Sequence, residues 1–315
     1  MTSQEIKNRL TALAGEYGFP ACAFASPDPV QQDGPLHPQA AVLVSDAAAL
    51  MPEAKCVMLC AMPYKPFRID PGQAHVDAYY LTSNRAHEQV QALAKAITES
   101  LGIAALPSPP IFIKPLAARS GLGEFGRSGL ISVGSHGTRV SIQAILIDAD
   151  VKPDAAHEKQ LSPQCEGCSA CVNACPMKAL DGTGRVNISL CLRAQPEGEP
   201  FPQEMRGKLG GSLLGCDICQ RVCPRNRQVG ETPMPESLSQ ALDLHSLLEG
   251  QYKPLIPFLG KNNARRQRLT ARALIAAANL GREDLIPLIE RLTGCKESEM
   301  VREHAVWAME QLSEE

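Results

Sequence analysis

Apolar positions in the first half of the chain change their spacing from one stretch to the next, which predicts both helices and strands. A long helix is expected from near Asp77 to Leu101, because apolar residues recur there on one helical face. A capping box of Thr2 and Glu5 predicts the start of another helix. Short, continuous apolar runs predict strands at Ala21–Ala25, Cys56–Met62, Ile111–Lys114 and Val140–Asp148. The alternation has no regular repeat, so this region is expected to be α/β or α+β.

The end of the chain is patterned for helices alone. Three stretches carry apolar and small residues at helical spacing, namely Leu269–Gly281, Asp284–Leu292 and Val301–Leu312. The first and third are similar, lie about thirty residues apart and have a different helix between them, which is typical of a short HEAT-like array. Such arrays present their helices as a binding surface.

Between these regions, cysteines gather in two runs that each end in Cys-Pro, with one further cysteine between the runs. Ferredoxins that hold two [4Fe–4S] clusters show this spacing, and the last Cys of each run ligates the cluster of the other run. One cluster is therefore predicted on Cys165, Cys168, Cys171 and Cys223. The second is predicted on Cys191, Cys216, Cys219 and Cys175. Cys191 stands further from its run than in a simple ferredoxin, which is acceptable because a ligand only has to reach its iron.

Structural zinc and a disulfide framework are the alternatives for these cysteines. A repeated thiolate run closed by Cys-Pro has no purpose in a zinc site, so clusters are the favoured interpretation. Four cysteines remain, and they are expected to be structural rather than reactive: Cys22, Cys56, Cys60 and Cys295.

Length and composition agree with a globular protein of several domains. The chain has 315 residues, of which 44% are hydrophobic, and a formal net charge of −3, so no global field selects a polyanionic partner. No apolar run is long enough for a membrane span, and the first residues do not form a signal peptide, so a cytoplasmic protein is expected. The predicted domains are an α/β domain at 1–155, a ferredoxin-like double-cluster insert at 156–230, and an α-helical HEAT-like unit at 231–315.

Positive charge is concentrated near the start of the last domain. Between Glu249 and Glu283 there is no acidic residue, and seven bases occur: Lys253, Lys261, Arg265, Arg266, Arg268, Arg272 and Arg282. A local basic patch suits phosphates, although a solvated helix start would give the same pattern.

Glycines gather after a short predicted helix that begins at Pro115. Gly121, Gly123 and Gly126 do not follow a strand, so they are not a dinucleotide fingerprint. A helix C-cap followed by a tight turn is the simpler interpretation.

The order of these parts resembles the epoxyqueuosine reductases. Stretches that carry the resemblance are Leu50–Val57, Ala117–Gly123, Gly126–Ile131, Leu214–Gln220 and Val301–Ala308, together with the delayed Cys191. Members of that family reduce epoxyqueuosine at the wobble position of tRNA, and they use cobalamin and two [4Fe–4S] clusters. The combination of parts is more specific than any one motif. The resemblance implies an oxidoreductase of queuosine biosynthesis, with tRNA and a low-potential electron donor as partners.

Site residues follow from the same resemblance. It implies tRNA contacts at Lys261, Arg265, Arg266, Arg268 and Arg272. Part of a corrinoid pocket is expected around Arg119, Gly121, Gly123 and Gly126. The protein is expected to act as a monomer, away from membranes.

The chain departs from the family where acids are expected. The family has an Asp-Tyr-His motif where this chain has Arg85, Ala86 and His87, and the stretch Ile111–Lys114 contains no acid. The proton is therefore expected from His87, Asp77, Tyr79, Tyr80 or Lys114. The alternative is an iron–sulfur electron-transfer protein, or a corrinoid reductase with another substrate.

Overall fold

The computed structural model describes residues 1–30, 42–154, 161–196, 198–294 and 296–313. These residues form two compact units, each assembled from three stretches of the chain. The first unit comprises Met1–Lys65, Thr82–Ile188 and Ile218–Gly230. The second comprises Pro66–Leu81, Ser189–Asp217 and Glu231–Glu315.

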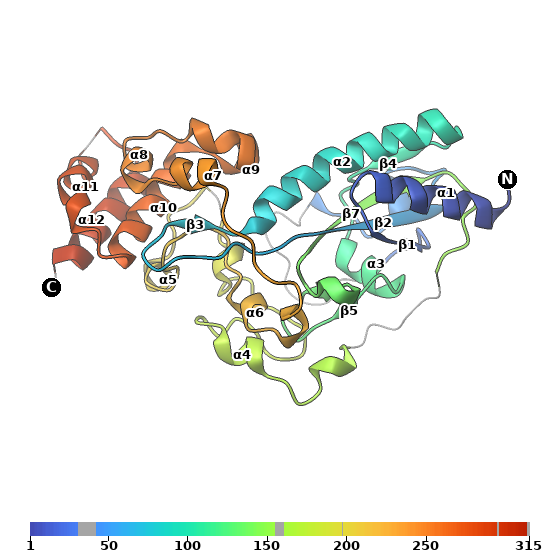
Figure 1. The fold of residues 1–315 in the computed structure, drawn as a ribbon, viewed down its shortest axis with the longest axis horizontal. Helices are drawn as coiled ribbons and strands as arrows, with labels where there is room; N and C mark the ends of the chain where they lie inside the picture. The colour runs from blue at the N-terminus through green and yellow to red at the C-terminus, as the bar shows by residue number, and fades with distance from the viewer. Residues whose placement is uncertain (31–41, 155–160, 197, 295, 314–315) are drawn as a thin grey trace. The chain divides into compact units, whose positions relative to one another are not determined.

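An antiparallel sheet of four strands is the centre of the first unit (Figure 1). Its order is β1 (Ala21–Ala25), β2 (Cys56–Pro63), β7 (Val140–Ile147) and β4 (Ala105–Pro107). Successive residues of β2 enter two different hydrophobic cores, as Val57 and Leu59 face one and Met58 and Cys60 face the other. Burial on both faces explains why this strand is a continuous apolar run.

Helices cover both faces of this sheet. α1 (Ser3–Glu16) and α2 (Ala78–Leu101) contribute to the core that contains Met58, and α3 (Ile113–Arg119) contributes to the opposite core. The predicted strands at β1, β2 and β7 and the predicted long helix are confirmed. The strand predicted at Ile111–Lys114 is wrong, because Ile111 makes only an isolated bridge and the chain turns into α3 two residues later.

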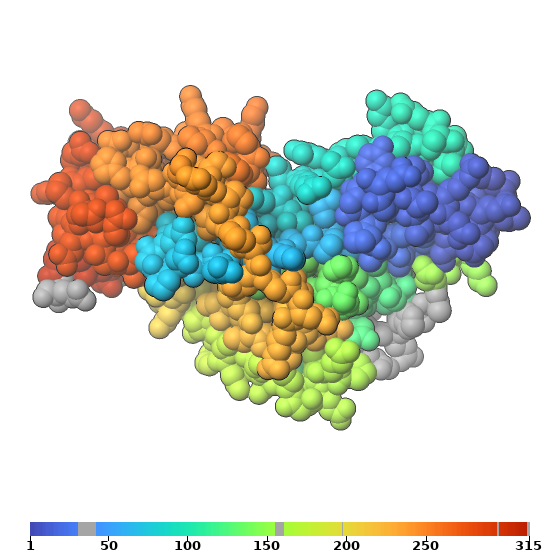
Figure 2. All heavy atoms as spheres, in the orientation of Figure 1, coloured from blue at the N-terminus to red at the C-terminus, as the bar shows by residue number. Residues whose placement is uncertain are grey.

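Short elements carry the cysteine runs. α4 (Ala170–Ala174) contains Cys171, the third cysteine of the first run, and packs against α6 (Ile218–Arg221), which contains Cys219. On the face shown in Figure 2, atoms of the two segments adjoin each other at the surface, in yellow-green and gold. A two-stranded ribbon of β5 (Glu124–Phe125) and β6 (Ile131–Ser132) lies in the same unit.

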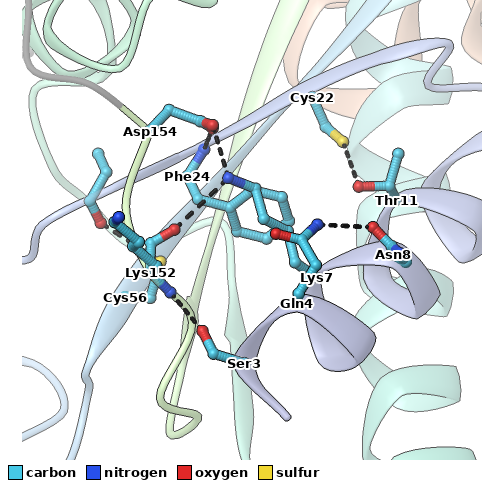
Figure 3. A network of polar contacts seen from close by, with 11 residues as sticks. Ser3, Gln4, Lys7, Asn8, Thr11, Cys22, Phe24, Cys56, Lys152 and Asp154 are labelled. Carbon is cyan, nitrogen blue, oxygen red and sulfur yellow. Dashed lines mark hydrogen bonds and ion pairs between the residues drawn. The ribbon is translucent and has the colours of Figure 1, made fainter.

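Polar contacts fix α1 to the rest of its unit (Figure 3). The capping box is confirmed, because Glu5 N–H donates to Thr2 Oγ1 and Thr2 N–H donates to the Glu5 carboxylate. Lys7 Nζ lies 2.6 Å from Asp154 Oδ1, and the other oxygen of Asp154 accepts from the N–H of Phe24 at 2.8 Å. One carboxylate thus joins the first helix to the first strand.

Among the cysteines outside the runs, Cys56 and Cys60 are buried and Cys22 is half-buried. Burial raises the pKa of Cys22, raises that of Cys56 to about 12, and raises that of Cys60 well above its ordinary value. Thiols held protonated in this way are poor nucleophiles, as expected of structural residues. Cys295 lies outside the described residues.

The second unit is mainly helical. Its helices are α5 (Gln203–Arg206), α7 (Glu236–Ala241), α8 (Leu244–Leu248), α9 (Ile256–Asn263), α10 (Arg266–Asn279), α11 (Ile286–Leu292) and α12 (Glu299–Ser313). α10 packs on α8 and α12, and small residues such as Ala273 and Ala277 are buried on it. β3 (His75–Val76) pairs in parallel with β8 (Ser212–Leu214). The three predicted helices are present, and their HEAT-like character stays a prediction.

None of the helices among the described residues combines the length and apolarity that a membrane span requires.

Candidate iron–sulfur site

Tight turns bring the cysteines of the first run together. The N–H of Cys168 donates to the carbonyl of Cys165 at 3.1 Å. The N–H of Cys165 donates in turn to the carbonyl of Ser162 at 2.8 Å. Gly167, at the turn between the first two cysteines, has a φ of +66°, which a residue with a side chain rarely adopts. The turn between Cys165 and Cys168 is therefore closed by a backbone hydrogen bond and favours glycine at position 167.

Four thiols of the first unit line one pocket. They are those of Cys165, Cys168, Cys171 and Cys223, the set predicted for the first cluster. Burial raises the pKa of Cys171 and Cys223, and the neighbouring sulfurs raise it further. Four thiolates around one space repel one another, and bound iron would offset that repulsion.

The donor set suits a [4Fe–4S] cluster, which is held by four cysteine thiolates. For a single metal ion, by contrast, no group of three or more His, Cys, Asp or Glu side chains among the described residues is suitably arranged. The described cysteines are free thiols rather than disulfides.

An ion pair supports the fourth ligand. Arg225, two residues after Cys223, donates to Ser162 Oγ at 2.6 Å and to Glu124 Oε2 at 3.0 Å. Ser162 Oγ also donates to Glu124 at 2.6 Å. The hydrogen bond from Ser162, followed by the contacts with Arg225, lowers the pKa of Glu124. Three segments far apart in the sequence thus meet beside the pocket.

Asn226 fixes the same turn from the other side. Its side-chain amide donates to the carbonyl of Gln220 at 2.8 Å, and its Oδ1 accepts from the N–H of Thr138 at 2.8 Å. A Cβ at Gly137 would clash with that oxygen, so this position requires glycine. The turn after Cys223 is therefore held by the side chain of Asn226, which contacts backbone groups of Gln220 and Thr138.

The predicted ligands of the second cluster are divided between the units. Cys175 and Cys219 belong to the first unit, and Cys191 and Cys216 belong to the second. Within the second unit, Gln195 donates to the carbonyl of Cys191 at 2.9 Å, which fixes the backbone of that residue. The assignment of these four cysteines to one cluster stays a prediction.

Three of the candidate catalytic residues meet in the second unit. Asp77 is 6% exposed, accepts from the N–H of Tyr79 at 3.0 Å and lies 3.3 Å from the guanidinium of Arg193. Arg193 also stacks over the rings of Tyr79 and Tyr80, with 4.0 and 5.4 Å between its Cζ and the ring centres. Asp77 is therefore both a cap of α2 and one half of an ion pair.

Gly215 brings this group beside the second cysteine run. Its φ is +88°, and a Cβ there would meet Asp77 at 2.7 Å and the ring of Tyr80 at 2.9 Å. Cys216 follows directly, and Arg193 stands two residues after Cys191. Sequence reasoning missed Arg193, although its place next to a predicted ligand was a usable signal.

His87 and Lys114 lie in the first unit. His87 is exposed, and its Nδ1 shares a hydrogen bond of 3.2 Å with Ser108 Oγ. Ser108 has a φ of +49°, unusual for a residue with a side chain. Lys114 donates to the carbonyl of Gly129 at 3.0 Å, close to the cysteine pocket.

The residues predicted around a corrinoid have contacts within the fold. Arg119 donates to the carbonyls of Ser26 and Asp28 at 2.6 and 3.0 Å, and burial lowers its pKa. Gly121 has a φ of +71° just after α3. A Cβ at Gly123 would meet the Ser132 carbonyl at 2.5 Å, so this glycine permits the pairing of β5 with β6. Gly126 lines the cysteine pocket, where a Cβ would lie 3.8 Å from the sulfur of Cys165.

The basic residues predicted to contact tRNA fall into two groups. Lys261, Arg265 and Arg266 are exposed near the N-terminal end of α10, and Arg266 lies 3.4 Å from Glu297. Arg268 and Arg272 are half-buried instead. Arg272 stacks on Phe201 with 3.7 Å from its Cζ to the ring centre, and burial lowers its pKa to about 9.

His304 lies under this second group and is fully buried. Its Nδ1 is 2.6 Å from the carbonyl of Met300, and its Nε2 accepts from the N–H of Phe201 at 3.1 Å. These partners fix a neutral imidazole with the proton on Nδ1, and burial lowers its pKa to about 4.

Comparisons with known proteins point to one family. Residues 164–226 match the model of a 4Fe-4S double cluster binding domain. The chain is 30% identical over 261 residues to the epoxyqueuosine reductase of Vibrio cholerae, across 77% of this chain and 69% of that protein. It is 29% identical over 206 residues to that of Staphylococcus aureus, across 63% of this chain and only 53% of the relative.

Solved structures show the same fold at lower identity. A structure of epoxyqueuosine reductase from Bacillus subtilis matches with a TM-score of 0.82 and 21% identity, over 99% of this chain and 91% of that one. Another crystal structure, of epoxyqueuosine reductase with an epoxyqueuosine-modified tRNA stem loop, matches with a TM-score of 0.79 and 20% identity, again over 99% of this chain and 91% of that one.

Proposed function

Since the chain belongs to the epoxyqueuosine reductase family, we propose that it reduces epoxyqueuosine to queuosine in tRNA, with two [4Fe–4S] clusters and cobalamin as cofactors. The observation that carries this proposal is the pocket lined by the four thiols of Cys165, Cys168, Cys171 and Cys223. A cluster held there supplies electrons one at a time at low potential. The match to a double-cluster domain supports a second cluster on the remaining four cysteines.

Reduction of an epoxide consumes two electrons and two protons, so the site must also handle protons. We assign this role first to Asp77 and Tyr80, because both lie against Gly215, directly before Cys216. Arg193 stabilises the carboxylate of Asp77 and orients both tyrosine rings. His87 is a further candidate, since its hydrogen bond to Ser108 offers a route for a proton.

We propose cobalamin as a cofactor because members of the epoxyqueuosine reductase family use it. When bound, it would supply low-valent cobalt chemistry that no amino-acid side chain provides. Arg119 and the three nearby glycines have the roles within the fold described above. Uptake of cobalamin by the purified chain is therefore a direct test of this part of the proposal.

Transfer RNA is the proposed macromolecular substrate, as a tRNA stem loop is the partner in one related structure. We assign phosphate contacts to Lys261 and Arg265, which are exposed near the N-terminal end of α10. The helix dipole adds positive potential at that end. Contacts to the backbone would position the tRNA body while the anticodon base enters the site.

The test is an anaerobic turnover assay with reconstituted clusters, cobalamin, a low-potential reductant and epoxyqueuosine-containing tRNA. Nucleoside mass spectrometry would then show queuosine. Absence of conversion, in protein that contains both clusters and cobalamin, would contradict the proposed substrate.

A second candidate function is an iron–sulfur electron-transfer protein or a corrinoid reductase with another substrate. The absence of acids at Arg85, Ala86 and Ile111–Lys114 favours it. Protein that fails to bind cobalamin would support the electron carrier.

We further propose that the chain works as a monomer in the cytoplasm, that its last three helices form a HEAT-like array, and that a separate low-potential donor reduces it. Size-exclusion chromatography with light scattering tests the oligomeric state.

A further inference from the structure

Two buried polar atoms at the pocket of the first cluster have no hydrogen-bond partner among the described residues. They are Nε of Arg127 and Oγ of Ser132, and both residues line the pocket together with the four thiols. All residues of this pocket belong to the first unit. Buried donors are nearly always paired in folded proteins, because an unpaired donor loses its hydrogen bonds to water without replacement. The acceptors are therefore expected to come from whatever the pocket holds.

The direction of the chain places the Ser132 hydroxyl on the pocket side of β6. Its neighbours Ile131 and Val133 are buried in a hydrophobic core of the first unit. Successive side chains of an extended chain point to opposite sides, so the side chain of Ser132 points away from that core. Ser132 itself is only 1% exposed, which keeps water from serving its hydroxyl at the surface.

The guanidinium of Arg127 lies close to the first cysteine run. A Cβ at Gly182 would lie 3.8 Å from Arg127 Nη1 and 3.7 Å from Cγ2 of Val172, which directly follows Cys171. Arg225 lines the same pocket, but its charge is paired with Glu124. Arg127 has no such ion pair within the part of the chain that the structure describes. Its positive charge is therefore available to the occupant of the pocket.

Thr138 provides a contrast at the same wall. It also lines the pocket, but its Oγ1 donates to Gln220 Oε1 at 3.1 Å and accepts from the side-chain amide of Asn226 at 2.9 Å. This hydroxyl is satisfied within the protein and needs nothing from the pocket. The unpaired donors are thus confined to Arg127 and Ser132 rather than being a general property of the wall.

We infer that Arg127 and Ser132 donate hydrogen bonds to sulfur atoms of the first cluster and thereby raise its reduction potential. Reduction adds one negative charge to the cluster, and donors beside its sulfurs stabilise that charge. The positive charge of Arg127 acts in the same direction. This inference rests on the clusters of the proposed function and is independent of the substrate.

The experiment is a dithionite titration of the reconstituted full chain, without tRNA or cobalamin, followed by EPR spectroscopy of the reduced clusters. The variants are Ser132→Ala, Arg127→Met and Arg127→Lys, the last of which keeps the charge and removes the guanidinium. One control is Ser120→Ala, at another buried serine of the first unit, whose hydroxyl donates to the carbonyl of Ala117 at 3.2 Å. The other control is Arg9→Met, which removes an exposed charge of the same unit.

Ser132→Ala and Arg127→Met are each expected to lower the midpoint of one cluster and to leave that of the other in place. The expected size is about tenfold in the equilibrium constant of reduction, which is 59 mV for a one-electron couple. Arg127→Lys is expected to lower the midpoint by less, because the charge remains. Both midpoints of the two controls are expected to equal those of the parent protein, and iron content is expected to be the same throughout.

Unmoved midpoints in Ser132→Ala and Arg127→Met would overturn the inference and would assign the two atoms to ordered water. Urea unfolding of the apo protein adds a second check, since an unpaired hydroxyl does not stabilise the apo fold. A lower urea midpoint in apo Ser132→Ala would therefore also overturn the inference. If Arg127→Met loses iron, Ser132→Ala and Arg127→Lys decide the question. A parent protein without clusters would contradict the proposed function as well, whereas intact clusters with unmoved potentials would contradict this inference alone.

Discussion

Buried His304 makes the stability of the second unit depend on pH in a direction that can be calculated. Its pKa is lowered from 6.5 to about 4, first by burial and also by the nearby charges of Arg206 and Arg272, while Met300 and Glu303 act in the opposite direction. The unfolded chain therefore binds a proton that the folded chain refuses between these two pH values. Stability is fully present above pH 6.5 and is lost as the pH falls toward 4.

Linkage gives the size of this effect. Between pH 7.5 and 5.5 the free energy of unfolding is expected to fall by about 1 kcal/mol, and by about 3 kcal/mol in all near pH 4. With a urea dependence of about 2 kcal/mol per molar, the first change moves the urea midpoint by roughly half a molar.

The chain contains a suitable reporter of this unit. Trp307 is its only tryptophan, is 6% exposed, and lies on α12 within a turn of His304. Urea unfolding followed by tryptophan fluorescence at pH 7.5, 6.5 and 5.5 measures the predicted change. His304→Gln has no group that titrates in this range, so its midpoint should vary less with pH. An equal pH dependence in the parent and the variant would refute the assignment to His304.

Three other predictions address the site and its partners. Cys223→Ala is expected to lose about half of the bound iron, whereas Cys60→Ala, at a buried thiol outside the runs, keeps the full iron content; equal iron in both would contradict the ligand assignment. Asp77→Asn is expected to lower turnover at least tenfold with both clusters retained, and an unchanged kcat would exclude Asp77 from proton handling. Lys261→Ala and Arg265→Ala should each weaken tRNA stem-loop binding and reduce the slope of log affinity against log salt by about one, as measured by fluorescence anisotropy; an unchanged slope would place the phosphate contacts elsewhere.

The larger elements could be predicted because an element buried on one face has apolar residues at regular spacing, and a strand buried on both faces is a continuous apolar run. β2 is a continuous apolar run since its residues enter two cores. Ile111–Lys114 misled because Ile-Phe-Ile is also compatible with the approach to a short helix, where Leu116 and Ala117 are the buried residues. β4 was missed because a strand of three residues that ends in proline is too short to show alternation.

Only part of the candidate site could be predicted from the sequence. Cysteine spacing is a local property of the chain, so it predicted the four thiols that line the pocket. The contacts that support them are not local, since Glu124 and Arg225 are about a hundred residues apart and only the fold brings them together. Arg193 is another such case, because its partner Asp77 comes from a distant segment.

The order of the cysteines along the chain also sets when the first cluster can be completed during synthesis. Cys165, Cys168 and Cys171 leave the ribosome roughly fifty residues before Cys223, which corresponds to several seconds of translation. During that interval a nascent chain has three ligands of the first cluster and lacks the fourth. By the time Cys223 appears, the other seven predicted ligands have all been made. The predicted ligand set of the first cluster is therefore complete only once Cys223 has been made, and a ribosome stalled before that point would present an incomplete thiol set to iron and oxygen.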